Sequence, residues 1–279
     1  MKMIEKLIFL FSRQKAIALG RTLGGWGYYL FRKRRLLALH NLKLAFKETY
    51  NEQQRKKIIR RVFQNLGITL IEFFRFSEVT EENLSHYVTI HGKEILDEAY
   101  SKNKGVLSLS AHLGNWEFLI NTIGLSGYKT AVISKSARQA YVNDYIFTHR
   151  TINNVTFLTG KQITKNILKL LKSGAVIGIV LDQHGVQSES VTVPFFGRNA
   201  YTLKSLAVLA LRTGAPVVPI YTYRDENYHH HVVIEPPIPL LEDDSIESCT
   251  LKYNQWLESV IQKHPDQWIW THNRWKIDE

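Results

Sequence analysis

The spacing of hydrophobic residues divides the chain into two parts. Before about residue 86, apolar positions recur at loose helical intervals, and residues 32–65 form a basic, leucine-rich amphipathic stretch. Residues 51–53 (Asn-Glu-Gln) are typical of a helix start inside this stretch. The run 66–76 continues the helical spacing. The pattern therefore predicts a helical N-terminal region over residues 1–85.

After residue 86, short β-rich runs alternate with helical ones, which predicts an α/β core over residues 86–279. The fully apolar run 176–181 is typical of a central strand covered on both faces. We expect a mixed, mostly parallel sheet flanked by helices, and one continuous structural domain that includes the N-terminal region. The expected strands are 106–111, 130–134, 155–158, 176–181, and an antiparallel pair at 217–223 and 230–234; the expected helices are 114–123, 141–150, 162–172, 203–212 and 246–264.

The net charge is unevenly distributed along the chain. Residues 1–76 contain 17 Lys and Arg against 4 Asp and Glu, a net charge of +13, whereas residues 77–279 carry a net charge of −2. A localised basic surface indicates an anionic partner, such as anionic lipid or an acidic carrier protein. Since the basic residues contain no recognised nucleic-acid-binding motif, we expect no nucleic acid partner. No apolar run reaches the roughly 18 residues of a spanning helix. This pattern favours peripheral or monotopic attachment to a membrane.

His112 and Glu117 are the strongest candidates for chemistry. They lie in the segment 110–117 (Ser-Ala-His-Leu-Gly-Asn-Trp-Glu), where a predicted strand ends and a predicted helix begins. Ligands of α/β folds usually bind at such junctions. If Glu117 lies in the first helical turn, its carboxylate can orient the His112 ring, whose other nitrogen can then take a proton. The same spacing also fits a structural histidine beside a glutamate that stabilises the helix N-terminus.

Two other clusters have competing interpretations. The run 229–231 (His-His-His) does not predict a metal site, because alternate residues of a strand face opposite sides and no Cys or carboxylate stands at ligand spacing. We therefore expect no metal. Trp268, Trp270 and Trp275 fit either a membrane-interface belt or the packing of the last segment onto the core.

Several short motifs occur in order along nearly the whole chain. His112 and Glu117 form a His-x4-Glu motif in a Gly-Asn-Trp-Glu context. By these motifs the sequence resembles the bacterial lipid A biosynthesis (late, secondary) acyltransferases, within the lysophospholipid acyltransferase-like superfamily. The resemblance implies a glycerol-3-phosphate acyltransferase-like α/β fold. The other matching motifs are Arg35 with 41–46 (Asn-Leu-Lys-Leu-Ala-Phe), 63–67 followed by Glu72, 182–183 (Asp-Gln) followed by 193–197 (Val-Pro-Phe-Phe-Gly), 214–219 and 267–275.

The resemblance also implies a reaction. His112 would act as general base on an acceptor hydroxyl, and Glu117 would orient the imidazole. The hydroxyl would attack an acyl thioester without a covalent acyl-enzyme, and no cofactor or metal would be needed. An oxyanion then develops on the thioester carbonyl and requires preorganised donors. Asn115 and the backbone amides at the helix start are the candidates.

The remaining candidate substrate-binding residues are less specific. Asp182 and Gln183 end the apolar strand at the edge of the sheet where ligands bind. Arg150 matches a family arginine associated with phosphate or head-group binding, and a solvated basic surface explains it equally well. The predicted substrate-binding set is completed by Phe195, Phe196 and Gly197, which fit an acyl-pocket wall or ordinary core, and by Arg274 in the C-terminal motif.

These observations predict an acyltransferase on the cytoplasmic face of the inner membrane. We expect acyl-carrier protein, or alternatively acyl-CoA, as donor, and the hydroxyl of a lipid A precursor as acceptor. The same chemistry on another glycolipid, a phosphatidylinositol mannoside, an aminolipid or a lysophospholipid stays open, because the sequence does not expose the head-group pocket. A basic module that binds nucleic acid or membranes without catalysis is the non-enzymatic alternative, and the lack of a recognised nucleic-acid-binding motif weighs against its nucleic-acid version. An inactive acyltransferase is a further alternative, and the intact His112 and Glu117 weigh against it.

Overall fold

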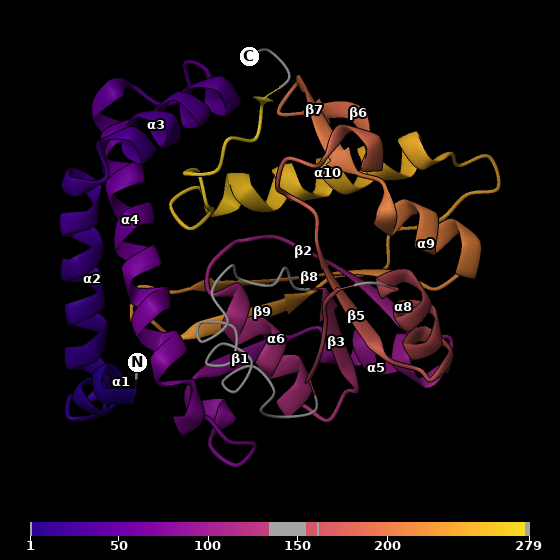
Figure 1. Cartoon of the computed structure of the whole chain (residues 1–279), viewed down its shortest axis with the longest axis horizontal. Coiled ribbons are helices and arrows are strands. Elements are labelled where there is room, and N and C mark those ends of the chain that lie inside the picture. Colours follow the sequence, from indigo (N-terminus) through magenta and orange to yellow (C-terminus); the bar gives the residue numbers. More distant parts are fainter. Residues whose placement is uncertain (1, 134–154, 161, 277–279) are drawn as a thin grey trace.

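The computed structural model describes residues 2–133, 155–160 and 162–276 (Figure 1). The expected helix 141–150, with Arg150, lies outside these residues. The helix start predicted at Asn51 is confirmed, because its side chain accepts from the Gln54 N–H and its own N–H donates to the Gln54 side chain. The N-terminal part contains α1 (Lys2–Phe9), α2 (Arg13–Leu30), α3 (Arg32–Phe46) and α4 (Glu52–Phe74).

A seven-stranded sheet forms the centre of the molecule, in the order β1-β9-β8-β2-β5-β3-β4. Every neighbouring pair is parallel except β8 and β9, which are antiparallel. The predicted α/β class, with a mixed, mostly parallel sheet flanked by helices, is confirmed, as is the central place of the apolar strand β5. The strands are β1 (Val88–His91), β2 (Val106–Ser110), β3 (Thr130–Ile133), β4 (Val155–Leu158), β5 (Val176–Val180), β8 (Val217–Arg224) and β9 (His230–Ile234).

Helices cover this sheet and also stand beside it. Figure 1 shows α2, α3 and α4 gathered at one side of the molecule, on the left in this view, with the sheet to the right of them. None of the helices in the described ranges combines the length and the apolar character needed to cross a membrane. The helices of the α/β part are α5 (Lys93–Ser101), α6 (Trp116–Leu125), α8 (Ile163–Lys172), α9 (Ser205–Thr213) and α10 (Ile246–Lys263), and 3₁₀ turns occur at Phe76–Glu78, Leu84–His86 and Gln187–Glu189.

A separate hairpin joins β6 (Ser190–Phe195) to β7 (Arg198–Leu203), and the sequence did not predict it. Its two turn residues, Phe196 and Gly197, have φ angles of 51° and 69°. Positive φ at both positions matches the right-handed twist of two paired strands. The predicted helix start at residue 203 is wrong, because residue 203 still pairs in β7. An aromatic residue in the turn hides the usual Asn-Gly or Asp-Gly signal of such hairpins.

Helices α2 and α4 pack backbone against backbone. A Cβ atom on Gly24 would lie 2.1 Å from the carbonyl oxygen of Phe63, and one on Gly67 would lie 2.2 Å from that of Gly20. Both distances are far below van der Waals contact, so the approach requires glycine. Gly20 and Gly24 therefore form the surface by which α2, an unbroken helix, contacts α4.

One hydrophobic cluster runs from the N-terminal helices into the α/β part. It contains Leu42 of α3, Ile59 of α4 and Leu107 of β2, all 0% exposed. The C-terminal segment lies between the two parts, because the Asn41 side-chain amide donates to the carbonyl oxygens of Trp270 at 2.9 Å and of His272 at 2.7 Å. The N-terminal helices and the sheet therefore share a core.

The three C-terminal tryptophans belong to that core. Trp268, Trp270 and Trp275 are at most 5% exposed, and the rings of Trp268 and Trp270 meet edge to face at 4.5 Å. Buried aromatic side chains of this size stabilise a core mainly through the apolar area they remove from water. Of the two interpretations of these residues, packing is confirmed.

Candidate active site

His112 lies in the loop that joins β2 to α6. Gly114 makes the turn with a φ of 59°, and a Cβ there would lie 2.4 Å from the carbonyl oxygen of Thr222. The Gly114 N–H donates to the Gln267 carbonyl oxygen at 3.1 Å. Strand β8 and the C-terminal segment therefore hold the loop from two sides. Only glycine fits this turn, because it combines a left-handed backbone with close contact to another strand.

Asp182 holds the His112 side chain. Its Oδ1 lies 2.8 Å from His112 Nδ1, while its Oδ2 accepts the His112 backbone N–H at 2.8 Å and the Trp268 indole N–H at 2.6 Å. Asp182 lies two residues beyond the last residue of β5, which pairs with β2, and the carboxyl ends of neighbouring parallel strands lie at one edge of a sheet. An ionised carboxylate only accepts hydrogen bonds, so Nδ1 carries the proton and Nε2 presents its lone pair.

The environment of Nε2 is open enough for a substrate. The His112 side chain is 21% exposed, whereas that of Asp182 is 0% exposed. The Gln183 side-chain nitrogen lies 3.4 Å from His112 Nε2, and the ring of Trp116 meets the imidazole edge to face at 5.2 Å. The pair therefore has a buried carboxylate end and an accessible imidazole end, which is the order that general base catalysis requires.

Two carboxylates tune the protonation of His112. Burial lowers the pKa of His112, but the charge and hydrogen bond of Asp182, together with the charge of Glu117, raise it by more, so the net shift is upward. Burial raises the pKa of Asp182, and the interactions with His112 and Trp268 outweigh it, so that pKa is lowered. The ionised form of Asp182 is therefore favoured, and in that form it can stabilise a protonated His112 imidazole.

Glu117 lies in the first turn of α6, half-buried, where its charge reaches His112. The carboxylate that bonds to the imidazole ring is Asp182, for which the sequence predicts a part in substrate binding. A signal for this partnership existed in the sequence, since Asp182 ends an apolar strand as His112 does. The orienting role of Glu117 stays a prediction.

Asn115 is turned into the protein. Its Oδ1 accepts the Phe118 N–H at 3.1 Å and caps α6, while its Nδ2 donates to Glu72 Oε2 at 2.8 Å. The side chain is 1% exposed. Its principal contacts therefore support the loop, and its predicted part in oxyanion stabilisation is untested.

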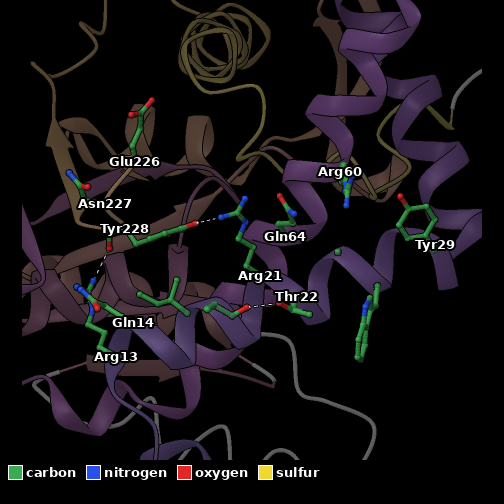
Figure 2. A pocket seen from close by; sticks show the side chains of 14 residues that line it. Arg13, Gln14, Arg21, Thr22, Tyr29, Arg60, Gln64, Glu226, Asn227 and Tyr228 are labelled. Atoms are coloured by element: carbon green, nitrogen blue, oxygen red, sulfur yellow. Dashed lines mark hydrogen bonds between the residues drawn. The ribbon is translucent and has the colours of Figure 1, made fainter.

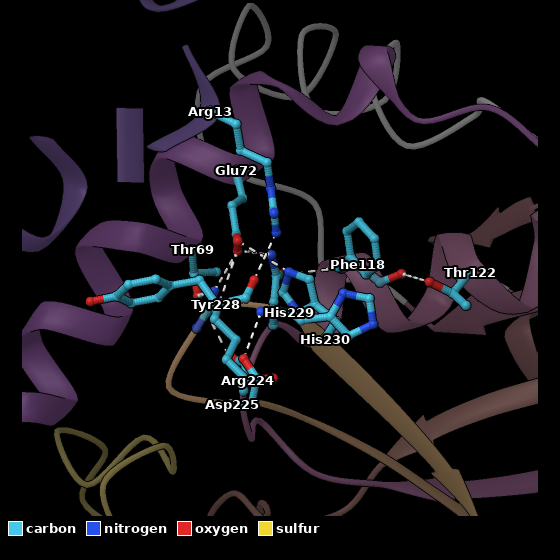
Figure 3. A network of polar contacts seen from close by, with 12 residues as sticks. Arg13, Thr69, Glu72, Phe118, Thr122, Arg224, Asp225, Tyr228, His229 and His230 are labelled. Atoms are coloured by element: carbon cyan, nitrogen blue, oxygen red, sulfur yellow. Dashed lines mark hydrogen bonds and ion pairs between the residues drawn. The ribbon is translucent and has the colours of Figure 1, made fainter. Parts of the chain in front are cut away.

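Glu72 is the centre of a buried polar network that the sequence analysis did not identify (Figure 3). Its Oε2 accepts from Arg224 Nη2 at 2.6 Å and from Asn115, and its Oε1 lies 3.1 Å from His230 Nε2. Phe118 stacks on the His230 ring at 4.3 Å. The network joins α4, β8, β9 and the first residues of α6, so it supports the loop that carries His112. Each charged residue of this network stands alone within an amphipathic stretch of the sequence. The sequence therefore gives no signal that these residues contact one another.

Three of the other predicted substrate-binding residues, Phe195, Phe196 and Arg274, are packed inside the protein, whereas Gly197 is exposed. Phe195 is 0% and Phe196 7% exposed, and Gly197 occupies the hairpin turn. Arg274 is 0% exposed, donates to the Tyr201 carbonyl oxygen at 2.7 Å and to Thr202 Oγ1 at 2.6 Å, and lies over the Phe195 ring. The structure brings Gln183 to His112 but joins Arg274 and Phe195 to each other away from solvent.

An apolar groove of about 480 Å³ runs between α2, α4 and the C-terminal segment. Leu66, Leu70 and Ile269 line it, and His272 stands at its margin. The His272 Nε2 accepts the His184 backbone N–H at 3.0 Å. Burial lowers the pKa of His272 to about 4, and the charges of Asp182 and His112 also act on it. The margin of the groove is therefore within electrostatic reach of the His112–Asp182 pair.

A family model and two curated relatives, each matching most of the chain, indicate the same family. A sequence model of the family described as bacterial lipid A biosynthesis acyltransferase matches residues 3–277. The lipid A biosynthesis palmitoleoyltransferase of Escherichia coli (strain K12) is 24% identical over 260 residues, which cover 92% of this chain and 84% of the relative. The lipid A biosynthesis lauroyltransferase of the same strain is 25% identical over 254 residues, which cover 88% and 80%.

Among solved structures, the crystal structure of the 1-acyl-sn-glycerophosphate (LPA) acyltransferase from Thermotoga maritima is similar with a TM-score of 0.38 and 15% identity. The match covers 82% of this chain and 94% of that one.

Proposed function

Since this chain belongs to the bacterial lipid A biosynthesis acyltransferase family and is an acyltransferase, we propose that it transfers a fatty acyl group from an acyl thioester to a hydroxyl of a lipid A precursor. The observation that carries the mechanism is the bond from His112 Nδ1 to the buried Asp182 carboxylate. This bond leaves His112 Nε2 as the base that faces solvent.

In the proposed reaction, His112 Nε2 removes the proton of the acceptor hydroxyl as its oxygen attacks the thioester carbonyl carbon. The tetrahedral intermediate collapses, the C–S bond breaks, and the imidazolium returns the proton to the leaving thiolate. Asp182 and Glu117 stabilise the imidazolium between the two steps, in keeping with the raised pKa of His112. No covalent acyl-enzyme is required.

The developing oxyanion requires donors close to the attacked carbonyl. The Gln183 side chain, 3.4 Å from His112 Nε2, and the backbone amides at the start of α6 are the candidates that we favour. Asn115 would then contribute indirectly, because its Oδ1 already caps α6. Arg150 is kept as a candidate for head-group binding on the basis of the family resemblance alone.

The test of the mechanism replaces His112 by Ala. Losing a general base costs on the order of 10²–10⁴-fold in turnover, so we expect a drop of that size with the fold retained. His40→Ala, which removes an exposed imidazole from α3, is the matched control. Purified protein is assayed with acyl-carrier-protein and acyl-CoA thioesters against a lipid A precursor and a lysophospholipid. A folded His112→Ala variant with near-wild-type turnover would contradict the mechanism, and transfer to the lysophospholipid alone would contradict the proposed acceptor.

We also propose that the apolar groove beside α4 holds an acyl chain. The groove presents mainly apolar side chains, and its margin at His272 lies near the catalytic pair. Burial of methylene groups there would supply about 0.8 kcal/mol per CH₂. The acyl chain would then reach from the groove toward His112.

A bulky residue at Leu70, 54% exposed in the groove, tests this proposal. We expect Leu70→Trp to reduce kcat/KM for long-chain donors by on the order of tenfold, because losing the space for one methylene group in an apolar pocket lowers kcat/KM by about that factor. The effect on short-chain donors should be smaller. Leu36→Trp places the same ring at a position on α3 that is 49% exposed and serves as control. Equal kcat/KM values for both variants at every chain length would exclude the groove as an acyl site.

We propose that the enzyme works at the cytoplasmic face of the inner membrane, where an acyl thioester and a lipid acceptor meet. The basic N-terminal quarter and the exposed apolar residues of its helices support attachment to an anionic surface. The exposed large hydrophobic residues of α1, α2 and their junctions include Leu7, Phe9, Leu10, Phe11, Leu23, Trp26, Tyr29, Leu30 and Phe31.

A further inference from the structure

A second cavity, of about 780 Å³, lies against the N-terminal helices, and His112 is not among the described residues that line it. Figure 2 shows the side chains of its lining. It is formed by one face of α2, by α4 and by the tip of the β8–β9 turn. Three arginines line it: Arg13 and Arg21 from α2 and Arg60 from α4. Among the described residues that line it, Glu226 is the one acidic residue, so these side chains carry a net positive charge.

The arginines are held by neutral groups. Arg13 Nη2 donates to the Tyr228 carbonyl oxygen at 2.7 Å, and Arg21 Nη1 donates to the Tyr228 hydroxyl at 3.4 Å. The Arg60 guanidinium lies over the Tyr29 ring, 5.9 Å from its centroid. Within the described part of the chain, none of the three forms an ion pair. Their charge is therefore available to an anion, and a planar guanidinium binds phosphate oxygens in a bidentate manner.

Tyr228 stands at the tip of the turn between β8 and β9. It has a φ of 61°, and its N–H donates to the Asp225 carbonyl oxygen at 3.1 Å. The Asp225 carboxylate accepts the backbone N–H groups of Asn227 and His229 at 2.8 and 2.9 Å. The turn is thus held from within. A fixed tyrosine that positions two guanidinium groups through its carbonyl and hydroxyl oxygens is a preorganised site rather than a loose basic surface.

The rim of the cavity is suited to a membrane interface. Trp26 and Tyr29, which line it, are 62% and 58% exposed, and the adjacent Leu30 is 76% exposed. Tryptophan and tyrosine are enriched at the level of lipid head groups, with apolar neighbours deeper. Basic groups beside exposed apolar side chains fit a phosphate whose lipid tails remain in the bilayer.

The cavity and the apolar groove occupy different sides of α2. The cavity touches Gly25 of α2 and Gln64 of α4, whereas the groove touches Gly24 and Gly67. The tight glycine contact of the two helices lies between them. A lipid held in the cavity would therefore leave the groove free for substrate.

We propose that this cavity binds the phosphate of an anionic membrane phospholipid, which orients the enzyme on the bilayer beside its apolar groove. The proposal rests on the membrane attachment proposed above and assigns it to a particular site. The ligand is distinct from both substrates of the transfer reaction.

The experiment measures binding to phosphatidylcholine vesicles with and without phosphatidylglycerol. The double variant R21Q/R60Q removes two cavity charges, and K33Q/K57Q removes two exposed charges from α3 and α4 as a charge-matched control. If only general attraction to an anionic surface holds the protein, both variants should lose the same vesicle affinity, because each loses two positive charges. We expect R21Q/R60Q to lose about tenfold more affinity for the phosphatidylglycerol vesicles than the control. Equal losses would overturn the proposal.

The variant R21K/R60K keeps both positive charges but removes the two planar guanidinium groups. It therefore distinguishes specific phosphate recognition from attraction by charge alone. Bidentate recognition predicts weaker binding than wild type, whereas unchanged vesicle affinity would overturn the proposal. Competition by inorganic phosphate in the millimolar range would identify a site for free phosphate and overturn the assignment to a lipid.

Acyl transfer measured in detergent solution distinguishes this proposal from the function itself. We expect R21Q/R60Q to retain turnover that depends on His112. Retained turnover together with unchanged vesicle binding would reject the cavity and leave the proposed function intact.

Discussion

Asp182 accepts hydrogen bonds from the His112 backbone, the His112 ring and the Trp268 indole, and its side chain has no exposure to solvent. At the residue scale this arrangement resembles the histidine–carboxylate part of a catalytic triad. The carboxylate fixes the tautomer and stabilises the positive charge of the imidazolium. The charge of Glu117 also raises the pKa of His112, and its contribution is smaller than that of Asp182.

The substitution Asp182→Asn tests this assignment. We expect turnover to fall on the order of 10³-fold, because the amide removes the charge and favours the wrong tautomer. His112 must be neutral to act as a base, and Asp182 raises its pKa. The acid limb of the kcat/KM profile should therefore move to lower pH in the variant.

The measurement is a pH profile of kcat/KM for wild type, Asp182→Asn and Glu117→Gln. A smaller shift in the same direction is expected for Glu117→Gln, because its charge is the last of the contributions to the His112 pKa. An acid limb that stays in place in Asp182→Asn would show that another group titrates.

At the scale of elements, the contact of α2 with α4 determines the shape of the N-terminal part. Gly20, Gly24 and Gly67 let the two backbones touch, and helices packed this closely gain dispersion contacts along their length. Gly25, one residue away, faces differently, since a Cβ there would meet only Gln64 Nε2 at 3.8 Å. Position 24 of α2 therefore requires glycine, whereas position 25 has room for a larger side chain.

We expect Gly67→Ala to destabilise the protein by about 1–3 kcal/mol, because the added methyl forces the helices apart. Gly25→Ala should be neutral or stabilising by up to about 1 kcal/mol, because alanine is the better helix former and has room. Denaturant unfolding of both variants gives the comparison. Similar unfolding free energies for the two would mean that the helices adjust their spacing at little cost.

At the scale of the whole molecule, Glu72 joins the N-terminal helices to the sheet. Burial raises its pKa, but Arg224 and His230 lower it by more, so the pKa lies well below its usual value of 4.5. A carboxyl with a lowered folded-state pKa contributes stability above its unfolded pKa, and that stability is lost as pH falls through the folded pKa. Part of the stability of the wild-type protein should therefore disappear below about pH 4.5.

We expect Glu72→Gln to lower the free energy of unfolding at neutral pH by about 3–5 kcal/mol, since it leaves the buried Arg224 charge without its partner. The variant should also lose the acid dependence contributed by this carboxyl. Unfolding is followed from pH 7 down to pH 3, with Glu52→Gln, which alters an exposed pair on the same helix, as control. Equal stability losses in Glu72→Gln and Glu52→Gln would contradict the proposed link.

Local patterns in the sequence determined much of this protein. The alternation of apolar runs predicted the sheet and its central strand, and the motif around His112 predicted the strand–helix junction, because both depend on neighbouring residues. The tertiary structure alone decided which carboxylate bonds to His112, since Asp182 lies 70 residues away along the chain. It also decided that Arg274 and Phe195 are interior and that Glu72 lies at the centre of a polar network. Such outcomes depend on long-range packing: the sequence places His112 and Asp182 each at the end of an apolar strand, but only the order of the strands in the folded sheet brings the two side chains together.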